Sequence, residues 1–101
     1  MNLNAAAQKL VDYLNNLCYS GERFVLCVDA NNGFSINVDD FKFHEYHRLD
    51  NGILELWSIS NNNNLSINLK DVERFEPYED NSGFAIHCNS YSVYLDNVEA
   101  V

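Results

Sequence analysis

The chain has 101 residues, of which 47% are apolar and 13% aromatic, and 15 acidic side chains against 6 Lys and Arg give a net charge of −9. This length suits one ordinary domain, and the apolar fraction is too high for a disordered chain. The negative charge disfavours direct binding to nucleic acid or to an anionic membrane, because such contacts need clustered cations. We therefore expect a single domain over residues 1–101 whose partner is a basic protein.

The first segment has apolar residues at three- and four-residue steps, namely Leu3, Ala7, Leu10, Leu14 and Leu17. This spacing predicts an amphipathic helix over about residues 4–18. Asn2 or Asn4 can cap its start, and Ser20-Gly21 can end it. The helix is too short to favour a coiled coil. Its leftover apolar positions leave a homodimer open, which the sequence does not decide.

From residue 23 onward the apolar period changes to two, which is typical of strands. Two alternating runs flank Ala30-Asn31-Asn32-Gly33 and predict a hairpin, because Asn and Gly tolerate a positive φ. The pair Asp39-Asp40 interrupts the alternation, and a third strand is expected after it. One side of that third strand should carry Phe41, Phe43, Glu45 and His47.

The second half of the chain predicts further strands separated by short polar turns. The turn Asp50-Asn51-Gly52 leads into a strand with large apolar groups on both faces, which indicates a central position. Pro77 ends pairing or marks a sheet edge. Short turns imply a meander in which sequential strands are neighbours. The predicted fold is α+β, with one N-terminal helix packed on a curved antiparallel sheet of about six to seven strands over residues 23–95, and a small barrel as the alternative.

Candidate catalytic and metal-binding residues form no recognisable pattern. His44 and His47 point to opposite faces of a strand, and so do His87 and Cys88, so neither pair predicts a zinc site. The sequence has no nucleophile motif and no glycine-rich phosphate loop, and no stretch is apolar enough to cross a membrane. Three widely spaced cysteines are typical of free thiols in a reducing compartment. We therefore predict a cytoplasmic protein that is not an enzyme and uses no metal or cofactor.

Acidic residues are concentrated in two segments, which form the candidate partner-binding site. The first segment contains Asp71, Glu73, Glu76, Tyr78, Glu79 and Asp80, in which the tyrosine is an aromatic anchor. The second contains Asp39, Asp40, Glu45 and Asp50. On a shared surface, alternate carboxylates along a strand would lie about 7 Å apart, comparable to nucleic-acid phosphates. Bidentate Arg–carboxylate pairing also resembles Arg–phosphate pairing. The competing interpretation is a solvated sheet edge whose charge prevents aggregation.

These features favour a non-enzymatic inhibitor that binds a basic nucleic-acid-binding enzyme through an acidic face. A nucleic-acid-mimicking phage or mobile-element protein of the anti-CRISPR type would have this character. The second alternative in rank is an immunity protein that neutralises a cationic nuclease toxin, and because its physics is nearly the same, the sequence does not separate the two. A small enzymatic or ligand-binding domain is the third alternative. It would be favoured by an apolar cavity lined by Phe43, Trp57, Phe84 and Tyr91.

Overall fold

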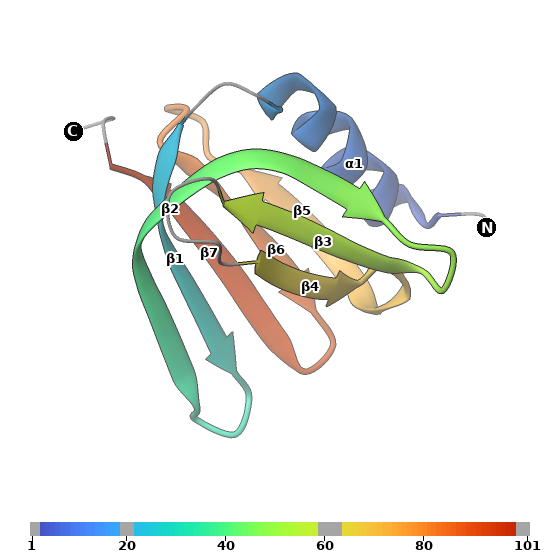
Figure 1. Cartoon of the computed structure of the whole chain (residues 1–101). Coiled ribbons are helices and arrows are strands. Elements are labelled where there is room, and N and C mark those ends of the chain that lie inside the picture. The colour runs from blue at the N-terminus through green and yellow to red at the C-terminus, as the bar shows by residue number, and fades with distance from the viewer. Residues whose placement is uncertain (1–2, 19–21, 59–63, 99–101) are drawn as a thin grey trace.

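The computed structural model describes residues 3–18, 22–58 and 64–98 (Figure 1). In chain order its elements are α1 (Ala5–Leu17), β1 (Arg23–Ala30), β2 (Ser35–Arg48), β3 (Ile53–Ser58), β4 (Asn64–Asn68), the short 3-10 helix η1 (Leu69–Asp71), β5 (Val72–Pro77), β6 (Gly83–Cys88) and β7 (Tyr91–Asn97). All strand pairs are antiparallel, and the predicted α+β class is confirmed. The expected helix signals Asn2 and Ser20-Gly21 lie outside the described residues.

Helix α1 begins at one of the two caps expected from the sequence. The side-chain oxygen of Asn4 accepts a hydrogen bond from the Ala7 N–H at 2.7 Å, which satisfies one of the unpaired amides of the first turn. The Asn4 amide also donates to the Val72 carbonyl at 2.9 Å and ties the helix start to β5. The buried face is the predicted stripe and consists of Ala7, Leu10, Val11, Leu14 and Leu17.

The seven strands are ordered β4-β3-β2-β1-β7-β6-β5. Sequential strands are neighbours, as in the predicted meander, except that β4 and β5 lie at opposite edges and β1 pairs with β7. The sheet is strongly curved, and Figure 1 shows β3 and β4 lying across β6 and β7. This curvature brings the two edges close enough for the three-residue helix η1 to connect them.

Strand β2 is continuous over 14 residues, where the sequence predicted two strands separated by Asp39-Asp40. Both aspartates lie opposite Val25 of β1, so two residues of β2 face one residue of its neighbour. This arrangement is a β-bulge, which bends a strand without ending its pairing. Both aspartates are exposed at the bulge. The predicted break was wrong because a bulge accommodates two adjacent polar residues within one strand.

A second register shift occurs at His44 in β2. After this shift Tyr46 packs against the core, whereas Glu45 and His47 lie on the outward side of the strand. The prediction that Glu45 and His47 share a side with Phe43 was therefore wrong. One extra residue reverses the alternation of side chains beyond it.

The core fills the space between the concave side of the sheet and α1. Its largest fully buried side chains include Phe24, Phe41, Phe43, Phe84, Leu10, Leu54 and Ile86. Tyr13 of α1 packs its ring against Phe75 of β5 and Phe84 of β6, with ring centroids 5.3 and 5.0 Å apart. Such aromatic pairs stabilise a core beyond the burial of their area. The helix therefore covers the side of the curved sheet next to β5.

Candidate functional site

The connection between β5 and β6 forms a tight, hydrogen-bonded turn. The Tyr78 N–H donates to the Gly83 carbonyl at 3.0 Å, and the Asn81 N–H donates to the Tyr78 carbonyl at 3.1 Å. Asp80 accepts from the Ser82 N–H at 3.0 Å. Asn81 has φ of 60°, a left-handed conformation that Asn adopts more readily than most residues. These contacts fix the acidic residues of the turn at one end of the sheet.

Gly83 lets this turn approach β7 closely. Its φ is 148°, and a Cβ at this position would lie 2.0 Å from the Leu95 carbonyl oxygen, so no other residue fits without a backbone shift. Gly83 pairs with Asp96 of β7. The carboxylate of Asp96 is therefore placed beside the turn, although the sequence did not single it out.

A shallow hollow of about 750 Å³ opens at this end of the sheet. We call it the acidic hollow, and it is lined by Glu76, Pro77, Tyr78, Glu79, Asp80 and Ser82. Burial raises the pKa of the Tyr78 hydroxyl, and the charges of Asp96 and Glu76 raise it further. Hydrogen bonds from the Ser82 side chain and backbone lower the pKa of Asp80. The hollow thus combines a half-buried phenol with carboxylates on its rim.

The bulge of Asp39 and Asp40 faces the same side of the sheet as Asp96. Val25 of β1 lies opposite the bulge and pairs in turn with Asp96 of β7, so all three residues are on one side of the sheet. Four strand spacings, roughly 19 Å along the sheet, separate the bulge from β5. Arg23 binds Asp40 with an Nε–Oδ1 distance of 2.8 Å, and Lys42 is the cross-strand partner of Arg23. Cations therefore offset much of the charge at the bulge, whereas no Lys or Arg is among the residues that line the acidic hollow.

Three of the remaining predicted residues lie away from the acidic hollow. Asp71 lies in η1 and accepts from the Asn89 side chain at 3.5 Å, at the end of β6 remote from the hollow. Glu73 is exposed at a register shift early in β5. Glu45 lies on the outward side of β2, 3.7 Å from His47. Residues that are contiguous in the acidic segment are thus spread along an extended strand.

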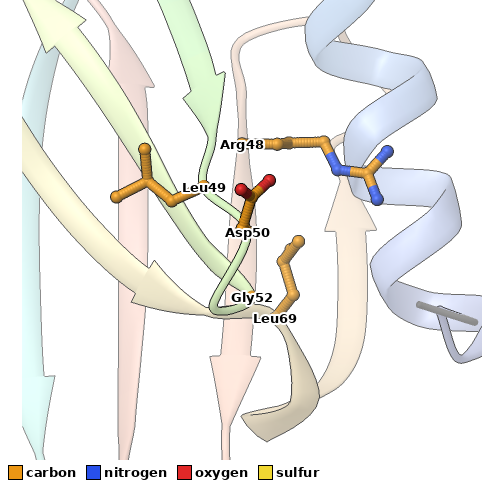
Figure 2. Close-up of a pocket in the computed structure, with 5 residues that line it drawn as sticks. All are labelled: Arg48, Leu49, Asp50, Gly52 and Leu69. Carbon is orange, nitrogen blue, oxygen red and sulfur yellow. The ribbon is translucent and has the colours of Figure 1, made fainter.

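Asp50 lies in the turn between β2 and β3, beside a different pocket of about 320 Å³. Figure 2 shows its lining residues, Arg48, Leu49, Asp50, Gly52 and Leu69. The side chain of Arg48 extends toward α1 in this view. The Leu69 N–H donates to the Gly52 carbonyl at 3.0 Å and ties the turn to η1. One cation and one anion share this pocket, so Asp50 does not extend the acidic hollow.

His87 is a residue near the hollow that sequence reasoning did not place there. Its Nε2 lies 3.3 Å from the Glu76 carboxylate, and its Nδ1 lies 2.9 Å from the Ser92 hydroxyl. A serine, a histidine and a carboxylate in a row have the connectivity of an activated nucleophile. Here Ser92 stands directly opposite His87 on the neighbouring strand, so strand register alone explains their contact. We therefore assign His87 the role of orienting Glu76.

The cavity that would have favoured a ligand-binding barrel is not formed by its expected residues. Phe43 and Phe84 are buried in the core, whereas Trp57 is exposed on the outward side of β3. Among the described residues no three His, Cys, Asp or Glu side chains gather in a way that could hold a metal ion. Cys18, Cys27 and Cys88 are free.

No family model matches the chain, and no curated protein or solved structure matches it. Within the part of the chain that the structure describes, no helix combines the length and apolar character needed to cross a membrane. The acidic hollow is therefore interpreted from its own geometry.

Proposed function

We propose that the chain is a non-enzymatic protein that binds a basic partner protein through the acidic hollow. The observation that carries this proposal is the half-buried phenol of Tyr78 among the carboxylates of Glu76 and Asp96. Glu79 and Asp80 add two exposed carboxylates on the rim. Aromatic side chains in partly desolvated hollows provide much of the binding energy of protein interfaces, and the surrounding charge supplies steering and selectivity for a basic partner.

The chemistry of the hollow favours arginine over lysine in the partner. A planar guanidinium can pair with a carboxylate through two hydrogen bonds and can stack on the Tyr78 ring at the same time. An ammonium group offers a point charge without that planar match. Grooves that bind nucleic-acid phosphates are rich in arginine, so the fitting partner is a nucleic-acid-binding enzyme. This supports an inhibitor of the nucleic-acid-mimicking, anti-CRISPR type that works in the cytoplasm, where free thiols persist.

The proposed surface is smaller than the one expected from the sequence. It consists of the acidic hollow and Asp96, with Asp39 and Asp40 as a partly neutralised extension. Glu45, Asp50, Asp71 and Glu73 are left out because they lie elsewhere on the molecule.

The test is calorimetric titration with nona-arginine and nona-lysine peptides. The hollow variant combines Glu76→Gln, Glu79→Gln and Asp80→Asn, and the Asn retains the oxygen that accepts from Ser82. The control variant combines Asp12→Asn, Asp50→Asn and Glu73→Gln, three exposed residues away from the hollow, with the same change in net charge. We expect the wild type to bind nona-arginine more tightly than nona-lysine, and less tightly as salt rises.

The hollow variant should lose at least about tenfold in affinity for nona-arginine. The control variant should lose no more than about twofold, the effect of net charge alone. Equal losses in the two variants, with both still folded, would show that the hollow has no special affinity for arginine.

A further inference from the structure

The two edge strands of the sheet are protected very differently. Strand β5 carries three charged side chains and Pro77, has a register shift and lies against α1. These are the devices that keep exposed sheet edges from pairing with other chains. Strand β4, at the opposite edge, has the sequence Asn64-Leu65-Ser66-Ile67-Asn68 and contains no charge and no proline. It pairs with β3 and with no further strand among the described residues.

The sequence of β4 is symmetric in residue type about Ser66. Read in either direction it runs amide, aliphatic, hydroxyl, aliphatic, amide. If two copies of β4 pair antiparallel about Ser66, Leu65 of one copy lies opposite Ile67 of the other, and Asn64 lies opposite Asn68. Asn64, Ser66 and Asn68 lie on the outward side of the strand, where amides and hydroxyls can pair across the two copies, whereas Ile67 is buried within its own copy. A two-fold symmetric dimer requires this kind of self-complementarity.

An uncharged surface continues from the β4 edge to the hairpin of β1 and β2. A hollow of about 590 Å³ beside the edge is lined by Val28, Ala30, Asn31, Asn32, Leu65, Ser66, Ser90 and Tyr91. Ile36 pairs with Val28 and therefore faces the same side of the hairpin. Phe34 and Ile36 are 60% and 47% exposed, which is high for such large apolar side chains. Figure 1 shows this hairpin projecting beyond the rest of the sheet.

The charge of the chain also limits how a second copy can approach the β4 edge. Two copies of a chain with net charge −9 repel each other at most approaches. The residues that line the β4 hollow are all uncharged. Glu55 of β3 is the cross-strand partner of Ser66, and the two Glu55 side chains of such a dimer would lie three strand spacings, roughly 14 Å, apart. Because β4 is symmetric in residue type about Ser66, the β4 strand of a second copy is a complementary partner for it.

We propose that two copies of this chain associate through antiparallel pairing of their β4 strands. The five-residue edge supplies backbone hydrogen bonds, and the exposed hairpin face supplies apolar area that the other copy covers. Both contributions are needed, since a stable interface buries about 800 Å² on each partner. The acidic hollow lies at the β5–β6 turn of the opposite edge strand, so the dimer presents two such hollows. The dimer proposal does not depend on what those hollows bind.

Sedimentation equilibrium of the full chain from about 1 μM to about 500 μM tests the proposal, because dimer formation depends on concentration. The mass should rise from 11.6 kDa toward twice that value. Added salt should strengthen the dimer, because it screens the repulsion between two acidic chains. Binding of an arginine-rich partner to the acidic hollow should respond to salt in the opposite direction.

The informative variant is Ser66→Glu, which places like charges opposite each other at the symmetry axis. We expect it to weaken the dimer at least about tenfold. Asn16→Glu is the matched control, because Asn16 is exposed on α1, outside the proposed interface, and lies beside the acidic residue Asp12, as Ser66 lies beside Glu55 of β3. It should leave the dimer unchanged. Thermal unfolding of both variants checks that each is folded.

Phe34→Ser provides a second test, because this exposed side chain contributes little to the fold of a single copy. It should also weaken the dimer. A chain that stays monomeric throughout the concentration range would overturn the proposal. A dimer that tolerates both Ser66→Glu and Phe34→Ser would overturn it as well, and would place the interface on another element such as α1.

Discussion

The hydroxyl of Tyr46 in β2 donates a hydrogen bond to the side-chain oxygen of Asn15 in α1. Together with the bond from Asn4 to Val72, it fastens the helix at both ends, once to β2 and once to β5. The helix therefore bridges two strands that are four positions apart in the sheet.

Loss of this bridge should destabilise the fold. Tyr46→Phe keeps the ring against the core and removes the hydroxyl, so we expect a loss of about 1 kcal/mol in the free energy of unfolding. Tyr94→Phe is the control, because its ring lies against His87 on the outward side of the sheet. It should change stability by less than about 0.5 kcal/mol. Urea unfolding followed by circular dichroism measures both, and equal effects would contradict the bridging role.

Two glycines with positive φ should respond differently to alanine. At Gly83 a Cβ would meet the Leu95 carbonyl oxygen at 2.0 Å, whereas at Gly33, with φ of 91°, no atom lies within 4 Å. Gly33→Ala should cost about 1 kcal/mol from backbone strain alone. Gly83→Ala should cost roughly 3 kcal/mol or more, because β6 and β7 must separate. The prediction fails if thermal unfolding gives the two variants similar stabilities.

Burial should make the fold sensitive to alkaline pH. It raises the pKa of the Tyr91 hydroxyl above its ordinary value of 10.0, and Cys88 nearby raises it further. A group whose pKa is raised by folding contributes stability that is present below its unfolded pKa and is lost as pH rises toward its folded pKa. Urea midpoints should therefore fall above about pH 10.

Tyr91→Phe should flatten this alkaline decline. The decline should remain in part, because burial also raises the pKa of Tyr13 and Tyr78. A decline as steep in Tyr91→Phe as in the wild type would show that ionisation of Tyr91 does not lower the free energy of unfolding.

Core and surface phenylalanines provide a further contrast. Phe84 is fully buried and contacts the rings of Tyr13, Phe24 and Phe75. Phe84→Ala should therefore destabilise the fold by about 3–5 kcal/mol, through lost burial and the cavity left behind. Phe34→Ala, at an exposed site, should change the stability of a single copy by less than about 0.5 kcal/mol at dilute concentration. Calorimetry checks both, and a mild effect at Phe84 would indicate a loosely packed core.

The helix and most of the strands could be predicted because each rests on a local pattern. The stripe from Ala7 to Leu17 and the cap at Asn4 depend only on neighbours in sequence. The bulges at Asp39 and His44 could not be predicted, since they depend on register against another strand. The same holds for the pairing of β1 with β7, which joins distant parts of the chain.

The candidate site was predictable in part for the same reason. Glu76, Tyr78, Glu79 and Asp80 are close together because a tight turn holds neighbouring residues. Asp71 is remote because an extended strand separates it from that turn. Asp96 was missed because it is the single acidic residue of β7, and only pairing with Gly83 brings it to the turn.

The place of β7 between β1 and β6 has a consequence for how the molecule is made. Strands β1 to β4 can form hairpins as they leave the ribosome. The edge of β1 that faces away from β2 stays unpaired until β7, the last strand, has been synthesised. Until then, the nascent chain exposes an unpaired apolar strand that a chaperone could recognise. Translation that stops before β7 would leave β5 and β6 without the strand that joins them to β1.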